Sequence, residues 1–182
     1  MVDGERQFAD NVGSMREVIT TLRAATGAAH RALEAELDPA WLCASRDRYT
    51  RFLAALYGFH ATAEATLAGL AVPGLDEAPS RTALLAADLR ILGVDPAGVP
   101  LMPAFLDGAD DGARYGLLYV VEGSALGGTV LARMVHTSLG IGPADGAAFF
   151  GAAASNPVRW RDAKAVLERE VGPAQLDAAA GA

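Results

Sequence analysis

Residues 116–133 read GLLYVVEGSALGGTVLAR, an apolar sequence rich in leucine and valine that predicts a helix. Four glycines interrupt it: Gly116, Gly123, Gly127 and Gly128. Each glycine inside a helix lowers stability by about 0.8–1 kcal/mol relative to alanine, so the four together cost roughly 3–4 kcal/mol. Such a cost indicates either a kink or a bare strip of backbone that another group approaches closely.

The spacing of these glycines predicts which face of the helix is bare. Gly116, Gly123 and Gly127 recur after seven and then four residues, so they share one side of the helix, which Gly128 and Ser124 widen. Two explanations remain open, a close crossing with another helix and the close approach of a flat ligand. Taken alone, the pattern favours the helix crossing.

The composition predicts a soluble, all-α protein of a single domain. Alanine and leucine supply most of the hydrophobic residues of this 182-residue chain, and β-branched residues are not clustered. The net charge of -7 argues against a nucleic-acid partner. Glu122 lies near the middle of the apolar helix, which argues against a membrane span. Cys43 is the single cysteine and no secretory signal precedes it, so we expect a buried thiol and a cytoplasmic location.

Capping residues and helix breakers divide the chain into six helices. Residues 1–13 are expected to form a flexible polar arm, and residues 173–182 a weakly specified tail. The domain between them, residues 14–172, is expected to be a helical bundle. The expected helices cover residues 14–37, 45–70, 80–92, 110–139 and 144–153, with a last one between Pro157 and Gly172.

One of the three histidines lies in a pattern typical of a metal ligand. Arg23, His30 and Glu34 share one face of the first helix, and small residues surround His30. Glu34 can accept a hydrogen bond from one ring nitrogen and leave the other free to bind a metal. The alternative is an ordinary histidine with a chance carboxylate one turn away. His60 is interpreted as a structural residue, and His136 as a group that complements the end of its helix.

Other chemistries lack their sequence patterns. No pair of Glu-x-x-His segments predicts a di-iron bundle, and neither a phosphate-binding loop nor a Gly-x-Ser-x-Gly elbow occurs. The remaining features are one histidine beside open space and one bare, bent helix. A flat, metal-bearing ligand between them would use both.

Three segments resemble the bacterial heme oxygenases, most closely the type associated with bacterial phytochromes. They are LRAATGAAHRALE at residues 22–34, YTRFLAALYGFH at residues 49–60 and LYVVEGSALGG at residues 118–128. The resemblance covers residues 15–170 in the family's order. It implies an all-α, heme-oxygenase-like bundle.

The resemblance also implies residue roles. His30 matches the proximal heme ligand, and Glu34 the residue that supports it. Arg23, and more loosely Arg159 and Arg161, match residues that contact the heme propionates. Gly123, Gly127 and Gly128 match the distal glycines whose backbone lies over the heme.

The chain departs from the family pattern in two places. Many members have an aspartate that organises the distal waters where this chain has Ser124. The family also has a final packed helix after about residue 175 of this numbering, where only a short segment is present.

The implied activity is cleavage of heme, which is both substrate and cofactor, to biliverdin, CO and Fe²⁺. The reaction uses O₂ and electrons from a separate ferredoxin or reductase, and a phytochrome could receive the product. Because the distal glycines carry no side chains, they offer no group that could promote the competing O–O cleavage. Ser124 with ordered waters would deliver the proton. The alternatives are a non-catalytic heme-binding or sensor protein on the same bundle and a helical interaction protein that binds no heme.

Overall fold

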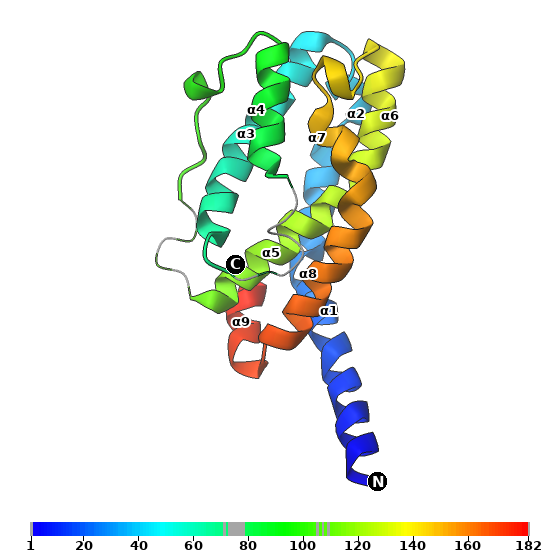
Figure 1. The fold of residues 1–182 in the computed structure, drawn as a ribbon, viewed down its shortest axis with the longest axis vertical. Coiled ribbons are helices and arrows are strands. Elements are labelled where there is room, and N and C mark those ends of the chain that lie inside the picture. The colour runs from blue at the N-terminus through cyan, green and yellow to red at the C-terminus, as the bar shows by residue number, and fades with distance from the viewer. Residues whose placement is uncertain are drawn as a thin grey trace.

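The computed structural model describes the backbone of residues 2–70, 72, 79–104, 106, 108 and 110–181, and side chains within these ranges from residue 17 onward. This part of the chain is helical and contains no strand, which confirms the all-α prediction (Figure 1). The longer helices are α1 (Val2–Glu36), α3 (Arg46–Leu67), α4 (Arg81–Ile91), α5 (Asp111–Ser124), α6 (Gly128–Leu139), α8 (Asn156–Glu170) and α9 (Pro173–Gly181). Shorter elements are α2 (Pro39–Leu42), α7 (Ala148–Gly151) and the 3₁₀ turns η1 (Pro96–Gly98), η2 (Ala125–Gly127), η3 (Pro143–Asp145) and η4 (Ala152–Ser155).

Side-chain caps set several helix starts where the sequence predicts them. Ser45, Ser80 and Asp110 accept hydrogen bonds from the backbone N–H groups three residues later, at 3.2, 3.0 and 2.9 Å. Gly140 ends α6 in the left-handed conformation, with φ of 67°. These boundaries confirm the sequence prediction because each depends on a local interaction.

The predicted start of the first helix is wrong. We expected a polar arm over residues 1–13 and a helix start at Ser14, but α1 begins at Val2. No proline interrupts this segment, and Glu5, Arg6 and Gln7 are good helix formers, so the capping pattern at Ser14 does not stop the helix from extending further. The side chains of residues 1–16 lie outside the described part.

The predicted C-terminal tail is also a helix. Pro173 occupies the first position of α9, where its missing N–H is not needed. The side chain of Gln175 accepts a hydrogen bond from the Gly172 N–H at 2.9 Å. Leu176 and Ala179 then pack in a hydrophobic cluster, so α9 closes this end of the bundle against α1 and α5. The local sequence signals at this end are weak because tertiary packing, rather than intrinsic helix propensity, holds α9 in place.

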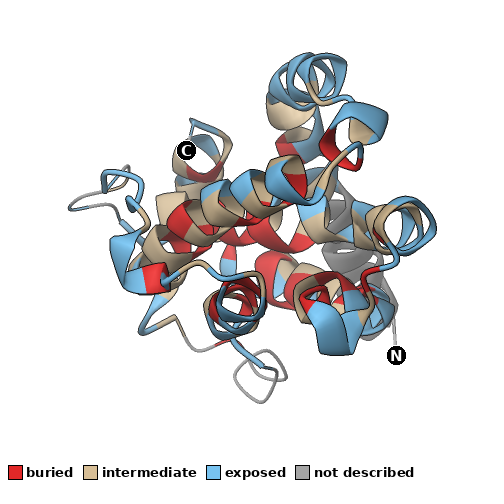
Figure 2. Ribbon diagram, turned by 90° about the horizontal axis from the view of Figure 1, so that it is seen from above, coloured by how far each residue is buried: buried red, intermediate tan, exposed pale blue. Residues whose placement is uncertain are grey.

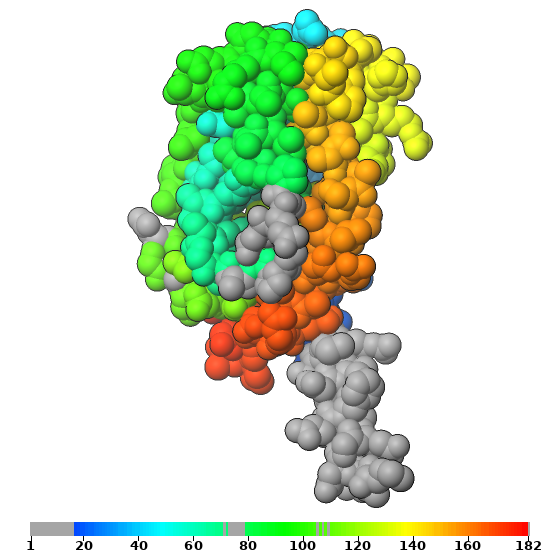
Figure 3. Space-filling model, viewed as in Figure 1, coloured from blue at the N-terminus to red at the C-terminus, as the bar shows by residue number. Residues whose placement is uncertain are grey.

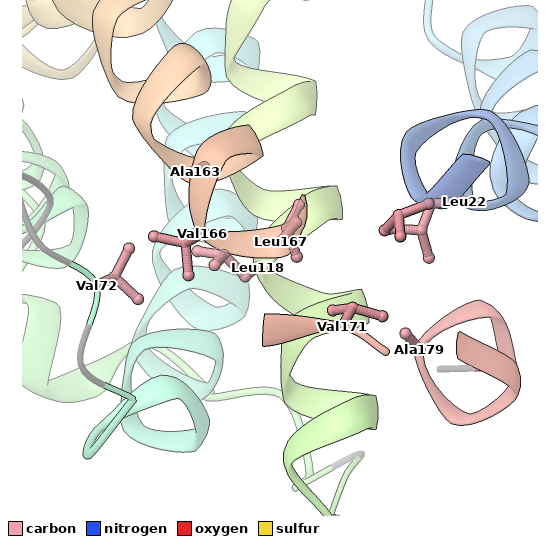
Figure 4. Close-up of a cluster of buried hydrophobic side chains, with 9 residues drawn as sticks. Leu22, Val72, Leu118, Ala163, Val166, Leu167, Val171 and Ala179 are labelled. Atoms are coloured by element: carbon pink, nitrogen blue, oxygen red, sulfur yellow. The ribbon is translucent and has the colours of Figure 1, made fainter. Parts of the chain in front are cut away.

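The core consists of two main clusters at opposite ends of the bundle. The first joins α1, α5, α8 and α9 through Leu22, Leu118, Leu167 and Ala179 (Figure 4). The second lies among α3, α4, α6 and α7, and includes the fully buried Tyr49. α4 and α7 pack against each other in this second part (Figure 3). Buried residues face the inside of the bundle and exposed ones the outside, as amphipathic helices predict (Figure 2).

The glycine-bearing helix is interrupted, as expected from its sequence. α5 ends at Ser124, the 3₁₀ turn η2 follows, and α6 continues in another direction (Figure 1). A 3₁₀ turn inside a long helix often marks a hinge or a functional segment. The bend separates the two core clusters, because α5 packs in the first and α6 in the second.

By length and composition alone, the whole segment Asp111–Leu139 could cross a membrane. This is weak evidence, because a core helix of a soluble protein passes the same test. Glu122 lies within the segment and is buried against two arginines of the same chain. α5 also packs on α3, α8 and α9, which fits a core helix better than a membrane span.

Candidate functional site

The four glycines of residues 116–128 do not share one environment. Gly116 lies against α9, where a Cβ atom would collide with the backbone of Ala179. One turn earlier, a Cβ at Gly112 would lie 2.9 Å from the carbonyl oxygen of Gln175. The helix-crossing explanation therefore holds for Gly116, which is not part of a bare face.

Gly127 is the glycine that faces open space. A Cβ built there meets no other atom within 4 Å. A Cβ built at Gly123 would lie 3.6 Å from the ring of Trp160, an ordinary van der Waals distance, and one built at Gly128 would lie 3.0 Å from the Cβ of Ala153, which is tight. Two large apolar side chains beside Gly127, those of Leu126 and Val130, are 42% and 61% exposed. The bend thus presents a small apolar surface around one bare glycine.

Side chains of α8 hold the bend from behind. The amide Nδ2 of Asn156 donates a hydrogen bond to the carbonyl oxygen of Ala125 at 2.6 Å. The guanidinium group of Arg159 donates to both carboxylate oxygens of Glu122, at 3.1 and 2.9 Å. Arg81 of α4 donates to Glu122 at 2.7 Å from the other side. Contacts therefore fix residues both before and within the turn η2.

Glu122 is a buried, ionised carboxylate. Burial raises its pKa, but the hydrogen bonds of Arg159 and the charges of Arg81 and Arg159 outweigh burial and hold the pKa below its usual value. Arg81 is as deeply buried, and among the described residues its Nε has no hydrogen-bond partner. Sequence reasoning used Glu122 only as evidence against a membrane span and missed Arg81 altogether. A charged residue in an otherwise apolar helix was the available signal.

Arg161, the other predicted arginine of α8, lies apart from the ion pairs of Glu122. Arg161 is 71% exposed and pairs with Asp162, the next residue, at 2.8 Å. Arg159 points to Glu122, so Arg159 and Arg161 do not converge on one group in this structure. The roles expected for them from family resemblance remain predictions.

The predicted set on α1 is exposed. His30 Nδ1 lies 3.3 Å from Glu34 Oε2, and the two side chains are 57% and 66% exposed. Arg23 is also exposed, and so is the apolar Leu33, at 58%. Within the described part of α1, no side chain from residue 23 to residue 36 is buried. This half of α1 therefore presents His30 and an apolar neighbour without covering either.

Packing at two points holds this half of α1 in the fold. Leu22, just before it, lies in the same core cluster as Leu118 of α5. The short helix α2, just after it, packs on α6. The segment with His30 therefore runs between two places where the chain contacts the bent helix. The two ends of the segment with His30 are therefore held against α5 and α6, the helices before and after the bend.

The larger of two described cavities lies elsewhere. It has a volume of about 260 Å³, and Arg81, Glu122 and Arg159 form its polar wall. Apolar residues such as Leu67, Leu118 and Val121 line the rest, and His30 is not among the lining residues. This cavity lies behind the bent helix, on the side of the ion pairs.

The other two histidines have separate environments. His60 is buried, with its ring edge against Phe59 and close to Phe149, and its Nδ1 has no hydrogen-bond partner among the described residues. Burial, together with the positive charge of Arg81, lowers its pKa to about 4, so the ring is neutral. His136 is exposed in the last turn of α6. The structural interpretation of His60 agrees with this burial, as does that of Cys43, which is buried as well.

Comparison with known proteins gives one clear relative. No family model matches the chain. A curated protein named "Heme oxygenase", from Xanthomonas campestris pv. campestris (strain 8004), is 43% identical over 106 residues, which cover 56% of this chain. Over this segment the chain is similar to a bacterial heme oxygenase. It spans about 60% of the length of that heme oxygenase.

Ser124 is the last residue of α5 before the bend. Its hydroxyl group donates a hydrogen bond to the carbonyl oxygen of Val121 at 3.3 Å, within its own helix. The residue is exposed, so the hydroxyl can also reach solvent. The role expected for Ser124 from the family resemblance remains a prediction.

Proposed function

We propose that the protein is a heme oxygenase that cleaves heme, with O₂ and external electrons, to biliverdin, CO and Fe²⁺. The observation that carries the proposal is the exposed His30, whose Nδ1 faces Glu34 at 3.3 Å and whose Nε2 is left for a ligand. The 43% identity to a bacterial heme oxygenase supports the same function.

The residues near His30 fit a heme. Nδ1 lies 3.3 Å from Glu34 Oε2, and a hydrogen bond from Nδ1–H to this carboxylate would fix the tautomer in which Nε2 carries the free lone pair, which is the form that binds iron. Leu33 on the same helix offers an exposed apolar surface. Burying apolar surface against a porphyrin contributes roughly 25 cal/mol per Å². Arg23, seven residues before His30 and on its face, supplies a positive charge for a propionate.

The bend of the glycine-bearing helix fits the opposite side of the heme. Gly127 has no side chain and open space beside it, so the backbone can approach a flat ligand closely. Leu126 and Val130 provide exposed apolar groups that such a ligand would cover. Gly123 and Gly128 contribute by letting the bend pack closely on α8 and η4, which is a role in shaping the backbone.

When bound, heme supplies the redox chemistry of the reaction, since the described side chains include no other redox group of that kind. The chain supplies positioning and proton delivery. His30 Nε2 would hold the iron, and Glu34 would keep the ring oriented. The absence of a side chain at Gly127 keeps strong hydrogen-bond donors away from the reacting side. The Ser124 hydroxyl, together with ordered waters, would pass the proton.

The proposal includes partners and a location. A ferredoxin or a reductase would provide electrons, and the product would serve either as a phytochrome chromophore or as the by-product of iron release from heme. A cytoplasmic location agrees with these partners. Arg161, exposed on α8, is a second candidate for a propionate contact.

Titration with hemin tests the proposal. We expect stoichiometric uptake with a histidine-ligated Soret spectrum, followed by a biliverdin absorption band when ascorbate or a ferredoxin system and O₂ are added. Absence of heme uptake would instead favour a helical interaction protein.

The alternative is a non-catalytic heme-binding or sensor protein. The hydrogen bond from Ser124 to its own helix favours it, because a hydroxyl held there is less free to organise waters than an aspartate. In the same titration, a stable ferric spectrum without biliverdin would support this alternative.

A further inference from the structure

We propose that Asn156 is a positioning residue that holds the bend of the distal helix in place, and so sets where a ligand over Gly127 is attacked. The claim that Asn156 sets the position of attack rests on the proposed function. The claim that Asn156 holds the bend concerns the protein alone and does not depend on heme. The hydrogen bond from Asn156 Nδ2 to Ala125 O, at 2.6 Å, is the observation that carries it.

The carbonyl oxygen of Ala125 accepts two hydrogen bonds. One comes from the Gly128 N–H, three residues later, which is the 3₁₀ pattern. In a continuous α-helix the donor would be the N–H of residue 129. The second donor, Asn156, fills the remaining lone pair of this oxygen. Insertion of a side chain into the hydrogen-bond ladder is a known cause of sharp kinks.

The donor itself is well placed and rigid. Asn156 is the first residue of α8, it is 7% exposed, and its helix packs on both α1 and α5. One turn further along α8, Arg159 binds Glu122, which lies just before the bend. Gly128, just after the turn, lies so close to η4 that a Cβ atom added there would be 3.0 Å from the Cβ of Ala153. Packing and hydrogen bonds therefore hold the chain before and after the turn, and Asn156 binds the turn itself.

Gly127 depends on these contacts for its position. It is the third residue of η2, two residues after the carbonyl that Asn156 holds, and it packs against nothing itself. A glycine-rich turn without side-chain contacts relaxes easily toward a regular helix. A change in the turn would move the bare backbone, and with it the surface presented to a heme.

Two variants of similar size separate the hydrogen bond from charge. Asn156→Leu and Asn156→Asp both remove the donor to Ala125. Leucine has no charge, whereas aspartate adds a negative charge that is favourable in the first turn of a helix. An effect on the bend that appears in both variants is therefore caused by loss of the hydrogen bond to Ala125. Ser155→Ala is the matched control, because among the described residues the Ser155 hydroxyl donates to Ala152 alone, in its own turn, at 2.8 Å.

The first measurement is amide hydrogen exchange of the protein without heme. We expect exchange of residues 125–131 to become about tenfold faster in both Asn156 variants, with the rest of the helices unchanged. Ser155→Ala should leave these residues as in the wild type. Unchanged exchange at the bend in both Asn156 variants would overturn the proposal.

The second measurement is the distribution of biliverdin isomers formed by the heme-loaded protein. We expect both Asn156 variants to shift the ratio of isomers cut at different meso carbons, with heme affinity within about threefold of the wild type. A purely structural role would lower stability without changing this ratio. Faster exchange with an unchanged isomer ratio would overturn the positioning role. If the wild type takes up no heme, the proposed function fails and the catalytic part fails with it, while hydrogen exchange still decides whether Asn156 holds the bend.

Discussion

Arg159 donates hydrogen bonds to both carboxylate oxygens of Glu122, at 3.1 and 2.9 Å, across the interface between α8 and α5. Arg81 binds the same carboxylate from α4, so that a single buried acid joins three helices. Glu122 and Arg81 are buried, and the side chain of Arg159 is 15% exposed, so two positive charges and one negative charge lie together largely shielded from water. Such an arrangement is stable only when every charge keeps its partner.

Replacement of Glu122 should therefore be severely destabilising. We expect Glu122→Ala to lower the free energy of unfolding by about 3–5 kcal/mol, because it leaves the buried Arg81 and the largely buried Arg159 without the carboxylate that they share. Urea denaturation measures the change. Glu34→Ala is the control, since its pair with His30 is exposed and contributes about 0–1 kcal/mol. Equal effects of the two substitutions would show that the buried pairs do not hold the helices together.

Alanine at two of the glycines should have opposite effects. We expect Gly116→Ala to destabilise the protein by about 1–3 kcal/mol, because the added methyl group collides with the backbone of Ala179. Gly127→Ala should stabilise it by about 0.4–1 kcal/mol, because its φ of -70° suits alanine and the space beside it is open. Thermal and urea unfolding of both variants provide the comparison. A loss of stability in Gly127→Ala would contradict the open environment.

These two glycines also show how far the sequence predicts the structure. Local signals set the starts of α3 and α4 at Ser45 and Ser80, because a cap acts over three residues. The pattern that joins Gly116 to Gly127 is local as well, yet their environments differ because α9 covers only Gly116. No local rule identifies that partner more than fifty residues away.

The site shows the same division. The pair of His30 and Glu34 was predictable because the two residues are one helical turn apart. The bonds of Glu122 to Arg81 and Arg159 span 41 and 37 residues, and a buried pair of this kind leaves no periodic pattern in the sequence. Asn156 was missed for the same reason, because its partner is a backbone carbonyl 31 residues away.

Removal of His30 tests the proposed iron ligand. We expect His30→Ala to lose the histidine-ligated Soret spectrum, and added imidazole to restore it in part by taking the place of the side chain. Absorption spectra of the heme-loaded protein with and without imidazole measure this. His136→Ala is the matched control, because that histidine is also exposed but lies at the end of α6. An unchanged Soret band in His30→Ala would remove this residue from the ligand role.

The stability of the protein should fall on mild acidification because of His60. Its pKa is lowered to about 4 in the folded protein from 6.5 in the unfolded chain, mainly by burial, so the unfolded chain binds more protons between these values. Stability is therefore complete above pH 6.5 and decreases toward pH 4, by about 3 kcal/mol in total. Glu64, Arg81, Glu122 and Arg159 all act on this ring.

Urea denaturation as a function of pH measures this effect. The range from about pH 5 to 6.5 is the informative one, because most carboxylates stay ionised there. His60→Gln removes the titrating group and should flatten the dependence in this range, whatever its own stability. An unchanged slope in the variant would assign the pH dependence to other groups.

A large side chain at Gly127 should change the reaction rather than the fold. Gly127 faces open space, so leucine is accommodated without a clash and should leave the free energy of unfolding within about 1 kcal/mol of the wild type. The side chain would, however, fill the place where the bare backbone approaches the heme. We expect Gly127→Leu to bind heme but to yield less biliverdin and more oxidation of an added peroxidase substrate such as guaiacol. Gly127→Ala, which adds one methyl group, should give a biliverdin yield between those of Gly127→Leu and the wild type. A normal biliverdin yield from Gly127→Leu would show that close approach of the backbone at Gly127 is not required.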